Sequence, residues 1–135
     1  MGDPRAQNSP TRPGAKPLIF VVDDEPVLLE LASSILVSAG YETKNFGDPA
    51  QALRAFIAAT PPPELVITDY AMGGFNGTDL IRECRRLRPE QKIIMLSGTA
   101  DESVFANLPA KPDRFMGKPY SPGDLVQLVK SVLAA

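Results

Sequence analysis

Short apolar runs that alternate with amphipathic segments are the feature that most restricts the fold of this chain. Three runs are continuous enough for strands covered on both faces, namely Leu18–Val22, Leu65–Asp69 and Lys92–Leu96. Tyr41–Phe46 is more polar and suits a sheet edge, and Asp113–Gly117 is a short fifth strand. Apolar strands that alternate with helices over short connections favour a parallel sheet with helices on both faces, joined by right-handed crossovers. The sequence therefore predicts a doubly wound α/β fold.

Five helices are expected to follow the five strands, and several begin at a proline or a capping residue. Gly77 or Thr78 is expected to cap the third helix. The fourth, over residues 101–108, is short because Pro109 and Pro112 follow it. The apolar positions at helical spacing are Leu28, Leu31, Ala32, Ile35 and Ala39 in the first helix, Leu53, Phe56 and Ile57 in the second, Leu80 or Ile81, Cys84 and Leu87 in the third, and Leu125, Leu128, Val129, Val132 and Leu133 in the last.

The length of 135 residues suits one compact domain. Residues 1–16 are proline-rich and poor in apolar side chains, so they are expected to form a disordered tail before a domain over residues 17–135. A net charge of -2 gives no attraction to nucleic acid or to anionic lipid. The N-terminal residues lack the apolar core typical of a signal peptide, and no apolar run reaches the roughly 18 residues that a membrane span requires. With one cysteine it suits a reducing cytosol, so we expect a cytoplasmic protein.

Polar residues stand at the predicted carboxyl ends of four of the five strands. These residues are Asp23 and Asp24 after the first strand, Asp69 at the end of the third, Ser97 after the fourth and Lys118 after the fifth. Each alone has a simpler explanation, since acids favour helix N-termini, Ser-Gly pairs form turns and lysines are commonly solvated. Ligands of parallel α/β folds, however, bind at the carboxyl ends of the strands. The shared edge therefore favours a site.

Three carboxylates at one edge repel one another unless a cation lies among them or some stay protonated. Since the chain has no histidine and a single cysteine, any metal is expected to bind through oxygen, which favours Mg²⁺, with Mn²⁺ as the alternative. A lysine ammonium and a serine hydroxyl suit the oxygens of a phosphoryl group. We therefore expect Mg²⁺-assisted phosphoryl transfer in which Asp69, the central carboxylate, is the nucleophile.

The order of these motifs resembles the receiver domain of two-component response regulators: Asp-Asp after the first strand, Asp after the third, Ser-Gly after the fourth and Lys-Pro after the fifth. The resemblance covers residue 17 to the C-terminus and implies a CheY-like sheet of order 2-1-3-4-5. It implies that Asp69 takes a phosphoryl group from a histidine kinase or phosphotransfer protein, or slowly from a small phosphodonor. The chain would then act on its own phosphoryl group only and would not be an enzyme.

The same resemblance assigns roles to the other site residues. It implies direct Mg²⁺ ligation by Asp24 and Asp69, with a further ligand from the main-chain carbonyl of Ala71. Asp23 would bind the ion directly or through a water. Ser97 and Lys118 would contact the phosphoryl oxygens, and the Lys118–Pro119 peptide bond would be cis. Phe115 matches the aromatic residue whose inward rotation accompanies the movement of Ser97 toward the phosphate.

Two departures from the family pattern bear on kinetics. Gly73-Gly74 follows Met72 where most receivers have a proline, so the loop is looser. Ala71 has no side chain that could orient an attacking water. We hypothesise that Ala71 and Thr99, two residues after the hydroxyl, tune the acyl-phosphate lifetime. An unchanged dephosphorylation rate in Ala71→Asn would contradict this hypothesis.

Two other functions stay open at this point. A binding scaffold that needs no phosphorylation would be expected to lack an acid or the lysine, and this chain keeps them. A Mg²⁺-dependent phosphatase with an Asp nucleophile would place an acid where Ala71 stands. As a receiver, the chain would signal through a protein target, through an output domain outside it or through a dimer that forms on phosphorylation. Neither nucleic acid nor membrane is an expected direct partner.

Overall fold

Five parallel strands form one sheet in the computed structural model, which describes residues 16–72, 76–98 and 110–135. The strands are β1 (Leu18–Val22), β2 (Glu42–Phe46), β3 (Leu65–Asp69), β4 (Ile93–Ser97) and β5 (Arg114–Gly117). They lie in the order β2-β1-β3-β4-β5, and every neighbouring pair is parallel. The expected α/β class and strand order are confirmed.

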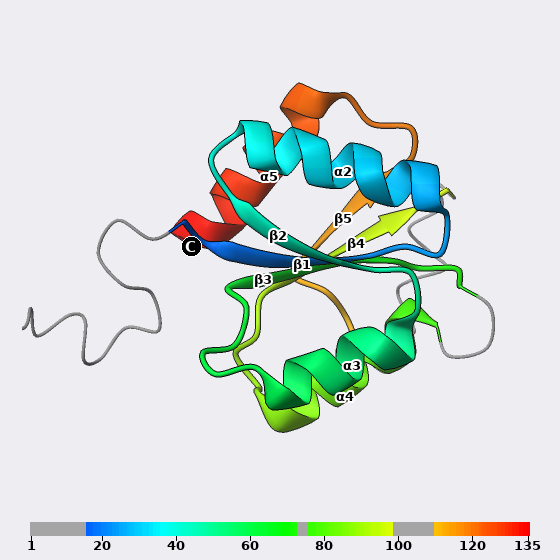
Figure 1. Cartoon of the computed structure of the whole chain (residues 1–135), viewed down its shortest axis with the longest axis vertical. Helices are drawn as coiled ribbons and strands as arrows, with labels where there is room; N and C mark the ends of the chain where they lie inside the picture. The colour runs from blue at the N-terminus through cyan, green and yellow to red at the C-terminus, as the bar shows by residue number, and fades with distance from the viewer. Residues whose placement is uncertain (1–15, 73–75, 99–109) are drawn as a thin grey trace, which may run out of the picture.

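Helices cover both faces of this sheet (Figure 1). α2 (Pro26–Ser38) and α5 (Pro122–Ala134) lie on one face, and α3 (Pro49–Ala58) and α4 (Gly77–Leu87) lie on the other. The described residues thus hold four helices, and none of these is long and apolar enough to cross a membrane. The short helix expected over residues 101–108 falls outside the described residues, as does the expected tail up to residue 15.

The two faces of the sheet carry separate apolar clusters. Ile19 and Val21 of β1 pack against residues of α2 and α5, whereas Phe20 and Val22 pack against residues of α3 and α4. β3 and β4 repeat this alternation, with Ile67 and Ile94 on the α2 and α5 side and their neighbours on the other. This burial on both faces is the reason that the central strands are apolar at successive positions.

Three of the inward positions predicted from helical periodicity are wrong. Leu31 in α2 is 51% exposed, Ile57 in α3 is 61% exposed and Leu87 in α4 is 44% exposed. In α2 the buried stripe passes instead through Ala32 and Leu36. Because α2 has apolar residues on adjacent sides, its sequence is compatible with more than one rotation about the helix axis. Contact with the sheet decides between them.

The cap of α4 also differs from the prediction, because Asn76 fills that position in place of Gly77 or Thr78. The Asp79 N–H donates to Oδ1 of Asn76 at 3.1 Å, and the Asn76 N–H donates to Oδ2 of Asp79 at 3.1 Å. This reciprocal capping box satisfies two N–H groups at the start of the helix. It fixes where α4 begins, directly after the loop that follows β3.

Cys84 lies on the buried face of α4 and is 1% exposed. Burial raises the pKa of its thiol from an ordinary 9.0 to about 12. We expect iodoacetamide at about pH 8 to leave Cys84 unmodified in the folded protein and to alkylate it in urea, because the thiolate is the reactive form. The neutral thiol also favours folding, so this contribution is complete below about pH 9 and declines as the pH rises toward 12. Rapid alkylation without urea would contradict the burial.

Candidate functional site

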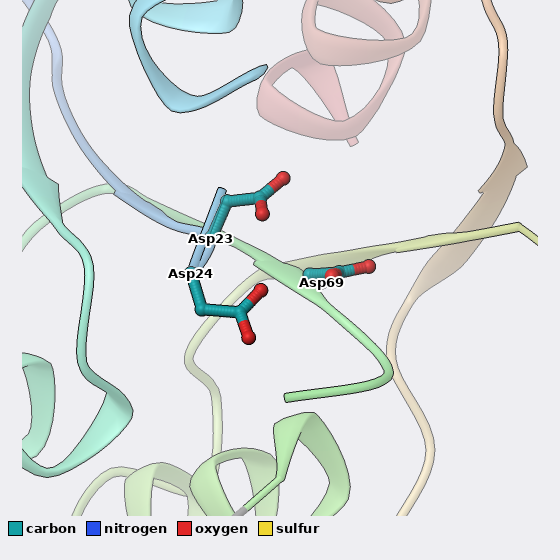
Figure 2. Close-up of side chains that lie close together, drawn as sticks. All are labelled: Asp23, Asp24 and Asp69. Atoms are coloured by element: carbon teal, nitrogen blue, oxygen red, sulfur yellow. The ribbon is translucent and has the colours of Figure 1, made fainter. Parts of the chain in front are cut away.

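Three carboxylates meet where β1 and β3 end. Asp23 and Asp24 follow β1, Asp69 is the last residue of β3, and the two strands are hydrogen-bonded neighbours. Figure 2 shows the three side chains close together at these strand ends. Each offers one oxygen, and the three oxygens lie within 4.8 Å of one another. Asp23 and Asp69 are only 4% and 8% exposed, whereas Asp24 is exposed, so solvent reaches the cluster on the Asp24 side.

The ammonium group of Lys118 bridges the two buried carboxylates. Its Nζ atom lies 3.1 Å from Oδ2 of Asp23 and 3.1 Å from Oδ1 of Asp69. The main-chain N–H of Lys118 donates to the carbonyl of Ser97 at 2.7 Å, which extends the β4–β5 pairing by one residue. The Lys118–Pro119 peptide bond that follows is cis. The lysine is therefore fixed both through its main chain and through its side chain.

Burial and charge together set the protonation of this cluster. Burial raises the pKa of Asp69, and the hydrogen bond and charge of Lys118 oppose that shift without cancelling it. Burial alone would lower the pKa of Lys118, but the hydrogen bonds and charges of Asp23 and Asp69 outweigh it and the pKa is raised. Lys118 therefore stays charged at neutral pH. One ammonium does not balance three carboxylates, so the cluster favours a further cation.

The donor set fits a hard metal ion. The cluster offers oxygen atoms of three carboxylates, of which one is open to solvent. Oxygen ligands with room for bound waters are what Mg²⁺ prefers, since it usually keeps part of its hydration shell. This acidic cluster can therefore bind a metal.

Comparison with known proteins decides the family. The family model for the response regulator receiver domain matches residues 19–130. The chain belongs to this family. It is 36% identical over 118 residues to the DNA-binding response regulator MtrA of Mycolicibacterium smegmatis. This match covers 85% of this chain and 50% of MtrA. It is 34% identical over 121 residues to the transcriptional regulatory protein AruR of Pseudomonas aeruginosa, covering 87% of this chain and 49% of AruR.

Solved structures agree with this family assignment. A CheY-like receiver domain protein from Methanospirillum hungatei matches with a TM-score of 0.79 and 30% identity, over 88% of this chain and 94% of that one. A response regulator from Chloroflexus aurantiacus matches with a TM-score of 0.81 and 28% identity, over 89% and 99%. The receiver domain spans about half the length of the curated relatives it matches. Its general role is that of phosphoacceptor module in two-component signalling.

The structure brings four of the predicted site residues together. Oxygens of Asp23, Asp24 and Asp69 lie within 4.8 Å of one another, and Lys118 contacts Asp23 and Asp69. Ser97 ends β4 and is buried, with its carbonyl bonded to the Lys118 N–H. Phe115 of β5 is half-buried and packs on the apolar cluster beneath α3 and α4. Ala71 is exposed two residues after Asp69, and Thr99 lies outside the described residues.

Gly77 is a residue of the receiver site that the sequence analysis considered only as a helix cap. A Cβ atom on Gly77 would collide with the main-chain carbonyl oxygen of Asp69 and would lie 3.2 Å from Cα of Tyr70. The Gly77 N–H also donates to the carbonyl of Tyr70 at 3.1 Å. The absent side chain thus lets the start of α4 lie against the backbone of Asp69. The sequence signal for a helix start at Gly77 is the capping pattern formed by Asn76 before it and Asp79 after it.

We expect Gly77→Ala to lower the free energy of unfolding by about 2 kcal/mol, because the new methyl group displaces backbone that has no room to move. Gly123→Ala is the matched control. Gly123 lies in the first turn of α5 with no atom near enough to obstruct a Cβ, so its replacement is expected to be neutral or slightly stabilising. Urea denaturation of both variants checks the prediction, and equal stabilities would contradict it.

Proposed function

We propose that Asp69 accepts a phosphoryl group and that the resulting acyl phosphate is the signalling state of this domain. One observation carries the proposal. The Asp69 carboxylate contacts an ammonium group, Lys118, and also belongs to a three-carboxylate cluster that can hold a cation. A carboxylate between two cationic groups stays ionised and is placed where negative phosphoryl oxygens would be stabilised.

Phosphoryl transfer to Asp69 forms one bond to phosphorus and breaks another. An oxygen of Asp69 attacks phosphorus and forms the new O–P bond, while the P–N bond to the imidazole of the donor breaks. The imidazole leaves with the bonding electron pair and takes a proton from solvent. With acetyl phosphate as donor, the bond that breaks is the P–O bond to acetate. Lys118 and the hydroxyl of Ser97 then donate hydrogen bonds to the phosphoryl oxygens, as both residues stand beside Asp69 at the strand ends.

Asp23, Asp24 and Asp69, with the main-chain carbonyl of Ala71, are the residues that would hold Mg²⁺. When bound, the ion would neutralise negative charge on the phosphoryl oxygens and reduce the repulsion between them and the carboxylates. Asp23 is already oriented for this task, because its Oδ1 accepts the main-chain N–H of Glu25 at 2.9 Å. Its other oxygen, Oδ2, accepts from Lys118.

The proposal extends to partners. The donor is the phosphohistidine of a histidine kinase or of a phosphotransfer protein, and the setting is the cytoplasm. The curated relatives are about twice the length of their matched parts and are named as DNA-binding or transcriptional regulators. Output through a domain outside this chain, through a separate protein or through a phosphorylation-dependent dimer therefore belongs to the proposal. The domain is expected to turn over its own phosphoryl group only, so it is not an enzyme for other substrates.

Incubation with acetyl phosphate, with Mg²⁺ or with excess EDTA, tests this function by intact-protein mass spectrometry. We expect a mass increase of one phosphoryl group with Mg²⁺ and none with EDTA. No adduct with any small phosphodonor or with a phosphorylated kinase would contradict the proposal and favour a binding scaffold. Repeated turnover of a small phosphate ester would instead indicate a phosphatase.

A further inference from the structure

The side chain of Asp113 joins the start of β5 to the start of β4. Asp113, the residue before β5, donates its main-chain N–H to the carbonyl of Ile93 at 2.8 Å. Its side-chain Oδ2 accepts the N–H of the same Ile93 at 2.7 Å. Asp113 therefore engages both main-chain polar groups of the first residue of β4. A shift of β5 along β4 would break both bonds at once.

Arg85 of α4 holds the Asp113 carboxylate in place. Its Nη2 atom donates to Oδ2 of Asp113 at 2.9 Å, and its Nη1 atom donates to the carbonyl of Lys111 at 2.9 Å. Its Nε atom donates to the carbonyl of Gln91 at 3.0 Å. One rigid guanidinium thus joins the segment that leads into β4 to the segment that leads into β5.

The pairing that begins at Asp113 ends at the phosphoacceptor site. The register runs from Ile94 opposite Arg114 to Ser97 opposite Gly117, and Lys118 then bonds to the Ser97 carbonyl. A slip of one residue would turn each β5 side chain to the other face of the sheet. The Lys118 ammonium would then lose its contacts with Asp23 and Asp69.

Apolar burial specifies the register of β5 only weakly. The strand has four residues, lies at the edge of the sheet and has exposed residues at both ends. Its two central residues, Phe115 and Met116, are only partly buried. The register of a short edge strand of this kind needs another specific interaction to fix it. The paired contacts of Asp113 supply one.

We propose that Asp113, oriented by Arg85, is a positioning residue that sets the register of β5 and so places the Lys118 ammonium against Asp69. This inference rests on the proposed function, because its kinetic readout is the phosphorylation of Asp69. The carboxylates that would bind the metal belong to the ends of β1 and β3, and β5 contributes none of them. Loss of the Asp113 contacts is therefore expected to slow phosphoryl transfer. The affinity for Mg²⁺ is expected to stay equal or to rise, because a displaced Lys118 competes less for Asp23 and Asp69.

The test compares Asp113→Ala, Asp113→Asn and Arg85→Met with the wild-type domain. The readouts are the phosphorylation rate from acetyl phosphate at saturating Mg²⁺ and the Mg²⁺ dissociation constant from calorimetry. Asp113→Ala is expected to be slower by roughly tenfold to a hundredfold, the size of effect that a misplaced active-site group produces. Asp113→Asn keeps an acceptor oxygen for the Ile93 N–H and is expected to stay close to wild type. Arg85→Met is expected to lie between them.

Arg86→Met is the matched control, because Arg86 is the neighbouring arginine on α4 and pairs with Glu83 of the same helix. It is expected to keep the wild-type rate. A wild-type rate in Asp113→Ala, a parallel loss of Mg²⁺ affinity, or an Asn variant as slow as the Ala variant would overturn the proposal. If Asp113→Ala does not fold, the phosphorylation rate of Arg85→Met tests the proposal in its place. A wild-type rate in Arg85→Met would then overturn the proposal.

Amine labelling separates a failure of this proposal from a failure of the proposed function. Lys118 is largely buried against two carboxylates, so an N-hydroxysuccinimide ester is expected to label it slowly in the wild-type domain and quickly in Asp113→Ala. This result would support the positioning role even if no phosphoryl adduct formed. Equal labelling of Lys118 in the two folded proteins would overturn it.

Discussion

Asp69→Asn is expected to abolish the phosphoryl adduct and to leave the fold intact. The amide of asparagine is a poor nucleophile, so no acyl phosphate can form at this position. Asparagine has nearly the same shape, and Lys118 keeps its contact with Asp23 at 3.1 Å. The substitution also removes a buried carboxylate that is repelled by Asp23 and Asp24. Stability at neutral pH should therefore be equal or higher, which thermal unfolding can measure.

Asp48→Asn serves as the control for this variant. Asp48 is the N-cap of α3, where its Oδ1 accepts the N–H of Ala50 at 3.0 Å, and asparagine caps helices equally well. It should form the adduct as the wild type does. An adduct on Asp69→Asn at the wild-type level would contradict the assignment of the acceptor.

Lys118→Met is expected to slow phosphoryl transfer about a hundredfold, the usual cost of losing one donor that stabilises developing charge. Methionine keeps the apolar stem and removes the ammonium. Without metal, two largely buried carboxylates then lose their shared cation, so the free energy of unfolding should fall by about 3 kcal/mol at neutral pH. Affinity for Mg²⁺ should rise, because Lys118 no longer competes for Asp23 and Asp69.

Lys130→Met is the matched control, since Lys130 lies exposed on α5. It should leave rate, stability and Mg²⁺ affinity unchanged. Lys118→Met, in contrast, is expected to show two opposite effects, a slower phosphoryl transfer and a higher affinity for Mg²⁺. A variant that transfers at the wild-type rate would show that the ammonium has no role in the reaction.

The strands were predictable because their burial on both faces leaves a continuous apolar run in the sequence. The second strand was also predictable as an edge, since β2 is polar from Glu42 to Asn45. The predicted face of α5 is also correct, since Leu125, Leu128, Val129 and Val132 are buried. The edges of the buried faces of α2 and α3 were not predictable, because Leu31 and Ile57 extend apolar stripes that are wider than those faces. Periodicity shows that a helix is amphipathic, and only contact with the sheet selects the buried side.

The acidic cluster and Lys118 were predictable because a parallel sheet gathers its strand ends at one edge. The contacts that hold these groups in place were not. The approach of Gly77 to the Asp69 carbonyl depends on how α4 lies against β3. The bond between Arg85 and Asp113 joins residues 28 apart in the chain, and both look like ordinary surface charges in the sequence. Such contacts follow from the tertiary arrangement and leave no local pattern.

Borohydride reduction of the phosphorylated domain tests the central claim most directly. Borohydride converts an aspartyl phosphate to homoserine, and peptide mass mapping then locates the modified residue. We predict homoserine at position 69 and unmodified aspartate at positions 23 and 24. Homoserine at position 23 or 24, or a phosphoryl adduct that leaves position 69 as aspartate after reduction, would contradict the account.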